Sequence, residues 1–341
     1  MAGVESRACV RIGMVGVGNV ATAHLTNILR IPEADVVGLA DIDPIRARAA
    51  LGRASGGSSP DIPIFSTAFQ MLASVQPQAV YICLPPNAHG EIELAAIEAG
   101  AHLMVQKPVG LDLCIATRIA GALARAGKIG VAGYQVRYAD VLDRARLVLG
   151  NREIGLAVGT YLGGLPDLAW WRKREISGGQ VIEQATHVVD LMRYLMGEAV
   201  EVYARAGTRL LHDVSGVNIA DVSAATIQFA SGAVGSLVNT CALTGVPGAD
   251  ADHGVTLIAR ELSAHIWIRR ARVATAGQEQ VFTAIRDPLF DLDSAFVHAV
   301  ATGDLSLVRS PYADAIESLR LTLAIEASAE QGCPVRPAEL S

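Results

Sequence analysis

The chain has 341 residues, a length that suggests two domains of about 150 residues each and excludes a short disulfide-stapled module. Hydrophobic residues make up 51% and charged residues 18% of the chain, which excludes a disordered protein and predicts a compact fold. The formal net charge is −6 and neither half carries a basic excess, so nucleic acid is not an expected partner.

The first 130 residues alternate short apolar runs with longer helical patterns. Strands are predicted at Val10–Val15, Val36–Ala40, Ala79–Leu84, His102–Val105 and Ile129–Ala132, and helices near Ala21–Arg30, Pro44–Arg53, Ala88–Ala99 and Leu111–Ala126. This alternation is typical of βαβ units on a doubly wound parallel sheet. We therefore predict an α/β protein whose first domain spans residues 1–130.

After residue 130 the pattern changes to two helices, then mostly strands, then a last helix. The helices are expected at Ala139–Leu149, Val181–Met196 and Tyr312–Ala329, and the strands at Glu201–Ala206, Ser223–Phe229, Ala233–Cys241, Val255–Ala259, Ala264–Ile268 and Arg272–Thr275. Residues 131–341 should therefore form a second α/β domain with a largely antiparallel open sheet.

The cysteines, the N-terminus and the hydropathy pattern bear on the cellular compartment. The five cysteines show no CxxC pair and no histidine at metal spacing, which argues against a disulfide framework or a structural zinc site. The N-terminus lacks a signal-peptide pattern, and no segment reaches about 18 consecutive apolar residues. We expect a cytoplasmic protein without a membrane span or a bound metal.

A glycine-rich turn, Gly16-Val17-Gly18-Asn19-Val20-Ala21, follows the first strand and opens the first helix. Glycines let a pyrophosphate approach the backbone, and the helix N-terminus offers free N–H groups with a partial positive charge. The motif predicts a dinucleotide site that includes Gly16, Gly18, Asn19 and Val20. A tight turn without a ligand would show the same pattern.

Asp41 lies at the end of the second predicted strand, 23 residues after Gly18. A carboxylate there can accept hydrogen bonds from the adenosine ribose hydroxyls and repels a 2′-phosphate, which favours NAD over NADP. Arg46 nearby leaves NADP open. The alternative for Asp41 is a helix N-cap, although Asp43 before Pro44 is better placed for that function.

Lys107, in Gln106-Lys107-Pro108, follows the fourth predicted strand, at the sheet edge where open α/β sheets bind ligands. The chain has only three lysines, the other two being Lys128 and Lys173, because arginine is used elsewhere. A compact ammonium whose pKa can shift suits catalysis better than a bulky, permanently charged guanidinium. We therefore expect a functional Lys107 rather than a solvated surface charge.

Glu183 and His187 are four residues apart in a predicted helix, a spacing that places both on one face. The carboxylate would then orient the imidazole for proton transfer. The alternative is a structural histidine beside a surface carboxylate. A metal site is not expected, because an HExxH motif and a third ligand are lacking.

Two further groups of side chains are candidates for ligand contacts. Trp170, Trp171 and Arg172 precede the Glu183 helix, and aromatic faces beside an arginine suit a polyhydroxylated ring, although loop tryptophans also serve as packing anchors. Pro85, Asn87 and His89 follow the third strand at the ligand edge of the sheet. We place them on the cofactor side, while His89 also fits a helix start.

Taken in order, these motifs resemble the Gfo/Idh/MocA family, named for glucose-fructose oxidoreductase and inositol dehydrogenase. The similarity runs from Ile12 to Gly332. The matching stretches are IGMVGVGNVATAHL, VVGLADIDP, ICLPPNAHGEIELAAIEAGAHLMVQKPVG, GGQVIEQATHVVDLMRYLMGE and AFVHAVATGDLSLVRSPYADAIESLRLTLAIEASAEQG. The resemblance implies a Rossmann dinucleotide-binding domain, then a substrate-binding domain whose open sheet forms dimers or tetramers.

The resemblance also implies roles for particular residues. NAD(P) would be bound by residues matching Gly16, Gly18 and Asp41, and the family's Glu-Lys-Pro motif falls on Gln106-Lys107-Pro108. Lys107, Glu183 and His187 would form the polar group at the reacting carbon. Gln106 departs from the usual glutamate, and this lost negative charge should lower the pKa of Lys107.

The function expected from these motifs is hydride transfer between NAD and a secondary alcohol or ketone of a sugar, cyclitol or related polyol. His187 would exchange the hydroxyl proton and Lys107 would stabilise the alkoxide, or the two roles would be exchanged. Two alternatives remain at this point. One is a sugar lyase or glycosidase that uses NAD redox chemistry transiently, and the other is a non-catalytic NAD- or sugar-sensing regulator.

Overall fold

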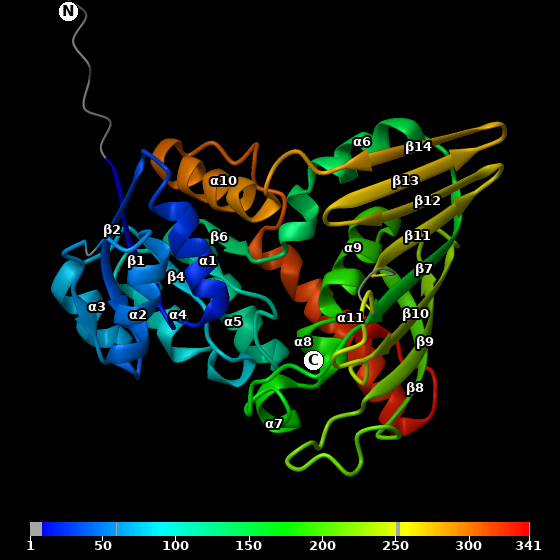
Figure 1. Cartoon of the computed structure of the whole chain (residues 1–341), viewed down its shortest axis with the longest axis horizontal. Coiled ribbons are helices and arrows are strands. Elements are labelled where there is room, and N and C mark those ends of the chain that lie inside the picture. The colour runs from blue at the N-terminus through cyan, green and yellow to red at the C-terminus, as the bar shows by residue number, and fades with distance from the viewer. Residues whose placement is uncertain (1–8, 59, 250–252, 341) are drawn as a thin grey trace, which may run out of the picture.

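The computed structural model describes residues 9–58, 60–249 and 253–340, and these residues build two β-sheets with packed helices (Figure 1). Residues 1–8, which begin the stretch expected to lack a signal-peptide pattern, lie outside the described residues. Within the described part, no helix is long and apolar enough to cross a membrane.

The first sheet has six parallel strands in the order β3-β2-β1-β4-β5-β6. Its strands are β1 (Val10–Val15), β2 (Ala34–Ala40), β3 (Ile64–Phe65), β4 (Ala79–Ile82), β5 (His102–Val105) and β6 (Gly130–Ala132). Its helices are α1 (Asn19–Ile28), α2 (Pro44–Ala54), α3 (Ala68–Val75), α4 (Glu91–Glu98) and α5 (Leu113–Ala126). The predicted doubly wound parallel sheet is confirmed.

Two local differences from the sequence prediction have simple causes. Strand β3 has only two residues, too few to show a periodicity, and it was missed together with α3. The helix expected over Ala88–Ala99 starts only at Glu91, after a short 3-10 helix at Pro86–Ala88. Gly90 interrupts it because its φ of 137° is a conformation that other residues rarely adopt.

The second sheet has eight strands in the order β14-β13-β12-β11-β7-β10-β9-β8. Its strands are β7 (Ile154–Leu162), β8 (Ala199–Gly207), β9 (Val222–Phe229), β10 (Val234–Thr240), β11 (Gly254–Ala259), β12 (Leu262–Trp267), β13 (Arg270–Thr275) and β14 (Gln278–Thr283). Only β7 and β10 pair in parallel, so the largely antiparallel sheet is confirmed. Strands β7 and β14 were not predicted.

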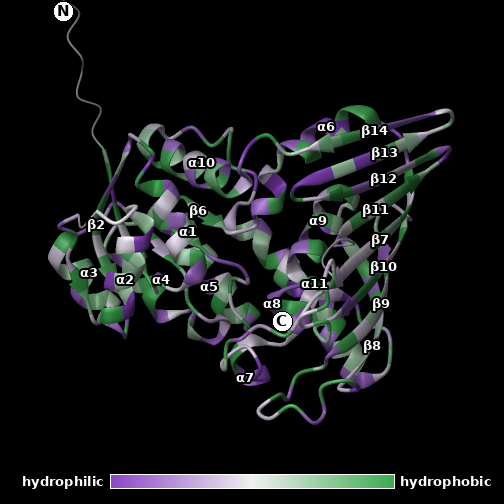
Figure 2. Ribbon diagram, in the orientation of Figure 1, coloured by the Kyte–Doolittle hydropathy of each residue, from purple (hydrophilic) through white to green (hydrophobic). Residues whose placement is uncertain are grey.

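Helices cover one face of this second sheet. They are α6 (Asp140–Leu149), α9 (Thr186–Met196) and α11 (Tyr312–Gln331). Met192 of α9 packs over β7 and β10, where a Cβ on Gly159 or Gly235 would approach its side chain within 3 Å. Figure 2 shows hydrophobic and hydrophilic residues interspersed along the strands, as expected for a sheet with one covered face.

The helix predicted over Val181–Met196 is wrong as a single element. The structure has α7 (Arg174–Ser177), α8 (Gln180–Glu183) and then α9, with a break at Gln184 and Ala185. At this break the Ala185 N–H donates to the Gln180 carbonyl five residues back, which widens the turn. Glu183 and His187 therefore do not lie on successive turns of one regular helix.

The C-terminal helices connect the two sheets. Helix α10 (Pro288–Thr302) lies beside α1, and its Leu292 and Phe296 are buried in the core of the first sheet (Figure 1). Helix α11 packs on α5 and also on β8 and α9. A division of the chain near residue 130 stays a prediction, because late segments contribute to both cores.

Candidate active site

The glycine-rich turn between β1 and α1 presents free backbone donors. Gly16 has a φ of 77°, and a Cβ there would lie 2.4 Å from the Cys83 carbonyl oxygen, so only glycine fits. Among the residues that the structure describes, none comes within 4 Å of a Cβ built on Gly18, and none caps α1 with its side chain. Open space in front of uncapped N–H groups fits the pyrophosphate of a dinucleotide.

Asp41 stabilises this turn from the end of β2. Its carboxylate accepts hydrogen bonds from the backbone N–H groups of Val17 (2.7 Å) and Asp43 (2.8 Å). It also pairs with the Arg46 guanidinium at 2.6 Å. The N-cap of α2 is Asp43, as predicted, because its carboxylate accepts from the N–H of Ile45 and of Arg46. Asp41 is therefore free of the capping role.

Two exposed apolar side chains beside Asp41 were not predicted as site residues. Ile42 is 91% exposed and Ile45 is 84% exposed. Their only signal in the sequence is that isoleucine occurs twice among charged residues where β2 ends and α2 begins. An apolar surface beside the Asp41 carboxylate suits the flat face of a purine ring.

Lys107 follows β5 at the carboxyl edge of the sheet, next to a cis peptide bond to Pro108. Its ammonium donates to the Glu183 carboxylate Oε1 at 2.6 Å and to the Glu183 backbone carbonyl at 2.5 Å. Both side chains are mostly buried. Because an ammonium has three donors, one N–H of Lys107 is left for a further acceptor.

The second carboxylate oxygen of Glu183 is held by Trp171. The indole Nε1–H of Trp171 donates to Oε2 at 2.6 Å. Both oxygens of Glu183 are thus taken by Lys107 and Trp171, which corrects the expectation that this carboxylate orients His187. The broken helix is the physical reason, since it removes the regular four-residue spacing.

His187 lies in the first turn of α9, with its ring partly buried and its edge toward Tyr134 at 6.2 Å between ring centroids. Its Nδ1 is buried and has no hydrogen-bond partner among the described residues. Burial, and then the positive charge of Lys107, lower the pKa of His187 well below 6.5. The imidazole is therefore neutral at pH 7 and able to accept a proton.

This lowered pKa predicts the pH dependence of His187. In the wild type the His187 resonance should titrate below pH 6.5, so the neutral base is lost only when the pH falls through that lowered value. Lys107→Gln removes the repelling charge and should raise the midpoint, although burial keeps it below 6.5. NMR titration of both proteins checks this, and equal midpoints would contradict it.

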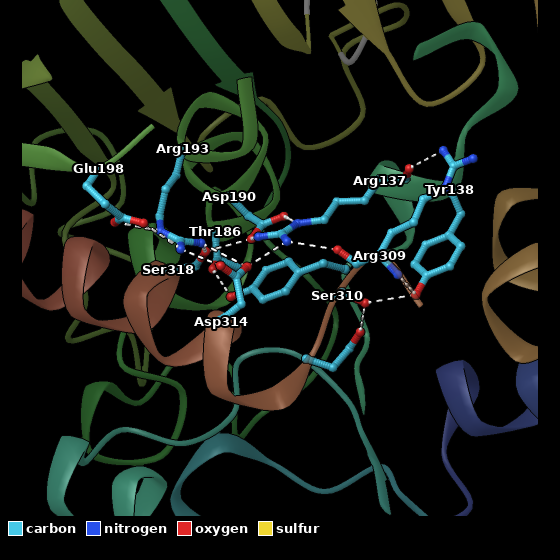
Figure 3. Close-up of polar contacts among 12 residues, drawn as sticks. Arg137, Tyr138, Thr186, Asp190, Arg193, Glu198, Arg309, Ser310, Asp314 and Ser318 are labelled. Atoms are coloured by element: carbon cyan, nitrogen blue, oxygen red, sulfur yellow. Dashed lines mark hydrogen bonds and ion pairs between the residues drawn. The ribbon is translucent and has the colours of Figure 1, made fainter. Parts of the chain in front are cut away.

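A buried ionic network holds α9, and with it His187, against the rest of the protein (Figure 3). Arg137 donates to both oxygens of Asp190 at 2.5 and 2.8 Å, and pairs with Asp314 at 2.6 Å. Arg193 binds the same Asp314 at 2.5 Å, and Ser318 donates to Asp190 at 2.6 Å. These contacts join α9 to α11 and to the segment before α6.

Gln106 is buried, and its side-chain amide contacts His24 and the Lys107 backbone. Its Oε1 accepts from the Lys107 backbone N–H at 3.1 Å, which leaves its Nε2 to face His24 Nε2 at 2.5 Å. His24 contacts Asp293 through Nδ1 at 2.6 Å. The ion-pair partner of Lys107 is Glu183, and the expected effect of residue 106 on the ammonium stays a prediction.

The remaining candidates have different environments. Trp171 is 1% exposed in an apolar cluster, so its ring is a packing anchor and the substrate contact expected for it is not supported, while Trp170 packs on the same cluster. Arg172 lies 3.6 Å from Asp167. His89 is buried and contacts Glu93 at 2.5 Å, with Pro85 and Asn87 preceding it at the edge of the sheet.

No group of three or more potential metal-ligating side chains occurs in the described ranges 9–58, 60–249 and 253–340. The features that remain are the glycine-rich turn, the Asp41 carboxylate after β2, the Lys107 ammonium after β5, and the neutral His187 imidazole on α9, whose pKa the charge of Lys107 helps to lower. This arrangement defines an NAD-binding oxidoreductase.

Two family models match the chain. Residues 10–134 match the GFO/IDH/MocA model described as "Oxidoreductase family, NAD-binding Rossmann fold", and residues 153–254 match the GFO/IDH/MocA C-terminal domain. The chain belongs to the GFO/IDH/MocA oxidoreductase family, which confirms the resemblance read from the sequence.

Individual relatives are distant. The chain is 25% identical over 236 residues to a myo-inositol 2-dehydrogenase of Thermotoga maritima, with 68% of each protein covered. It is 27% identical over 241 residues to a scyllo-inositol 2-dehydrogenase (NAD(+)) of Bacillus subtilis, covering 67% of this chain and 66% of the relative. A solved scyllo-inositol dehydrogenase of Lactobacillus casei, with NAD(H) and scyllo-inositol, superposes with a TM-score of 0.75. That structure is 19% identical, with 97% of this chain and 100% of that chain covered.

Proposed function

We propose that this protein is an NAD-dependent dehydrogenase that oxidises a secondary alcohol of a cyclitol, sugar or related polyol. The observation that carries the proposal is the pair formed by Lys107, with one donor left over, and His187, kept neutral by burial and by that same lysine. The names of the relatives, which include inositol 2-dehydrogenases, support this substrate class.

The cofactor would be held by the N–H groups of the glycine-rich turn, with Asp41 on the ribose and Ile42 against the adenine. Asn87, His89 and the Gln106 segment would lie along its nicotinamide half. Bound NAD supplies the hydride acceptor.

The proton is handled by the chain's own residues. His187 accepts the proton of the substrate hydroxyl, because its neutral imidazole is already present at pH 7. The free N–H of Lys107 donates to the same oxygen and stabilises its developing negative charge. Glu183 balances the ammonium charge in the partly buried site. Because Lys107 is an ammonium paired with Glu183, this geometry favours Lys107 as the donor and His187 as the acceptor over the exchanged roles that the sequence left open.

The proposed function is tested by the absorbance of reduced nicotinamide. The purified protein is mixed with NAD and with cyclitols, simple sugars and sugar acids, and each cofactor is titrated separately to measure binding. We expect NADH to accumulate with at least one polyol. Confirmed NAD binding without NADH accumulation on any of them would contradict the proposal.

Cofactor choice is expected to depend on the Asp41–Arg46 pair. In Asp41→Ser the repelling carboxylate is removed and Arg46 is released toward a 2′-phosphate. The ratio of kcat/KM for NADP to that for NAD should rise at least ~10-fold, the lower range for a charged hydrogen bond. The double variant Asp41→Ser/Arg46→Ala is the control, and an equal rise there would rule out Arg46 as the cause.

A homo-oligomer through the second sheet is also proposed. On the uncovered face, Leu156 of β7 lies between Val234 of β10 and Ile258 of β11, and all three are exposed apolar side chains. Such a row favours an interface between copies. Val234→Glu should shift the molar mass in solution toward the monomer, as measured by light scattering. The control is Val246→Glu, in an exposed loop, and equal masses for the wild type and Val234→Glu would contradict this interface.

The cellular location stays an expectation. All five cysteines lie in the described residues and none forms a disulfide. This state suits a reducing compartment such as the cytoplasm.

A further inference from the structure

Glu183 is bound on both sides of its carboxylate by side chains from different segments. Oε1 accepts from the Lys107 ammonium on the first sheet, and Oε2 accepts from the Trp171 indole before α7. Each distance is 2.6 Å, within the range of charge-assisted hydrogen bonds. The orientation of this carboxylate is therefore set by two donors.

We propose that Trp171 is a positioning residue that directs the Lys107 ammonium through Glu183. A carboxylate without the indole bond is free to turn and to offer both oxygens to the ammonium. The hydrogen bond from the indole keeps Oε2 away from Lys107. The ammonium therefore donates two hydrogen bonds to Glu183, one to Oε1 and one to the backbone carbonyl. Its third N–H then keeps a fixed direction toward the substrate oxygen.

Trp171 is itself held rigidly. It is 1% exposed and packs with Ile219 and Cys241. The loop that carries Ile219 is anchored by Asn218, whose backbone N–H donates to the Arg172 carbonyl at 3.1 Å. Because the Trp171 indole is held in place by this packing, its N–H can fix the orientation of the flexible Glu183 side chain.

A carboxylate in the same loop reinforces this anchoring. Asp221 is fully buried and accepts backbone hydrogen bonds from Arg209, Leu210 and Leu211 at 2.6 to 3.0 Å. Because these bonds close the loop on itself, Ile219 is held against the indole. Contacts therefore run without a gap from Ile219 to the Trp171 indole, and from there through the Glu183 carboxylate to the Lys107 ammonium.

The kinetic test uses Trp171→Phe, which keeps an aromatic ring but removes the indole donor together with part of the ring volume. This inference rests on the proposed function, so kcat is measured for the polyol oxidation. We expect kcat to fall about tenfold or more, the loss expected from misdirection of a catalytic group, with the Kd of NAD unchanged. Trp267→Phe on β12 makes the same chemical change outside the contact and should leave kcat unchanged.

A double-mutant cycle separates positioning from packing. In the Glu183→Ala background, Trp171→Phe should change kcat by less than about twofold, because the carboxylate through which Trp171 acts is absent. An equal fall in both backgrounds would show that Trp171 acts through packing and would overturn the proposal. A wild-type kcat in Trp171→Phe would overturn it as well.

A spectroscopic arm does not depend on activity. The chain has three tryptophans, so the indole N–H spectrum has three signals, and the Trp171 signal is identified as the one missing in Trp171→Phe. We expect this signal to move in Glu183→Gln and in Lys107→Gln, while the other two stay in place. An immobile Trp171 signal would overturn the proposal, whereas a moving signal without any polyol oxidation would contradict only the proposed function.

Discussion

Lys107→Ala and His187→Ala are each expected to lower kcat for polyol oxidation by at least ~100-fold, while the Kd of NAD stays close to that of the wild type. Loss of His187 removes the neutral base, and loss of Lys107 removes the donor that stabilises negative charge on the substrate oxygen. Stopped-flow turnover and cofactor titration measure the two quantities separately.

Lys128→Ala is the matched control for the lysine variant, because Lys128 lies in the turn after α5 and is not part of the site. Its kcat should equal that of the wild type. Near-normal turnover of Lys107→Ala or of His187→Ala would contradict the assignment of that residue. A parallel fall in NAD binding would point to loss of the fold.

Arg137→Met is expected to lower the free energy of unfolding by about 3–5 kcal/mol, the range for breaking a buried ion pair from one side. The variant leaves Asp190 buried without the bidentate guanidinium that balances its charge. Burial already raises the pKa of Asp190, and loss of Arg137 should raise it further. Protonation then relieves the unpaired charge, so the destabilisation should shrink as the pH falls. Urea unfolding at several pH values measures both effects.

Arg272→Met is the control for this measurement. Arg272 pairs with Glu279 at 2.6 Å, but both side chains are about half exposed, and a surface ion pair that water and salt screen contributes little to stability. A loss in Arg137→Met that is no larger than the loss in Arg272→Met would contradict a stabilising role for the buried network. Full stability at neutral pH in Arg137→Met would do the same.

The N-terminal half could be predicted closely because its physical signals are local. Strand β1 was expected at Val10–Val15 and has those bounds, since all its residues except Arg11 are buried and the strand is therefore a short, mostly apolar run. Asp43 before Pro44 correctly indicated the start of α2. By contrast, β7 at the centre of the second sheet was missed, because its glycines at positions 155 and 159 weaken the strand pattern. Gly159 is explained by Met192 and Val188 of α9, whose side chains would each lie 2.6 Å from a Cβ at that position.

The residues of the candidate site could be predicted from the sequence, but the contacts between them could not. Lys107, Glu183 and His187 could be singled out from residue type and motif, and the structure brings the first two into direct contact. Their pairing could not be derived, because a helix period over 181–196 predicts Glu183 beside His187. The widened turn at Ala185 redirects Glu183 toward Lys107 and Trp171, and only packing against the first sheet specifies it.

The sequence by itself therefore determined the fold class, the dinucleotide turn and the identity of the polar side chains, because periodicity and glycine spacing act over a few residues. Only the tertiary structure decided which side chains meet and which protonation state they hold. The buried place of Trp171, the network around Asp190 and the lowered pKa of His187 all arise from contacts between segments distant in the chain. Burial and charge at these contacts depend on the complete fold, which no local pattern encodes.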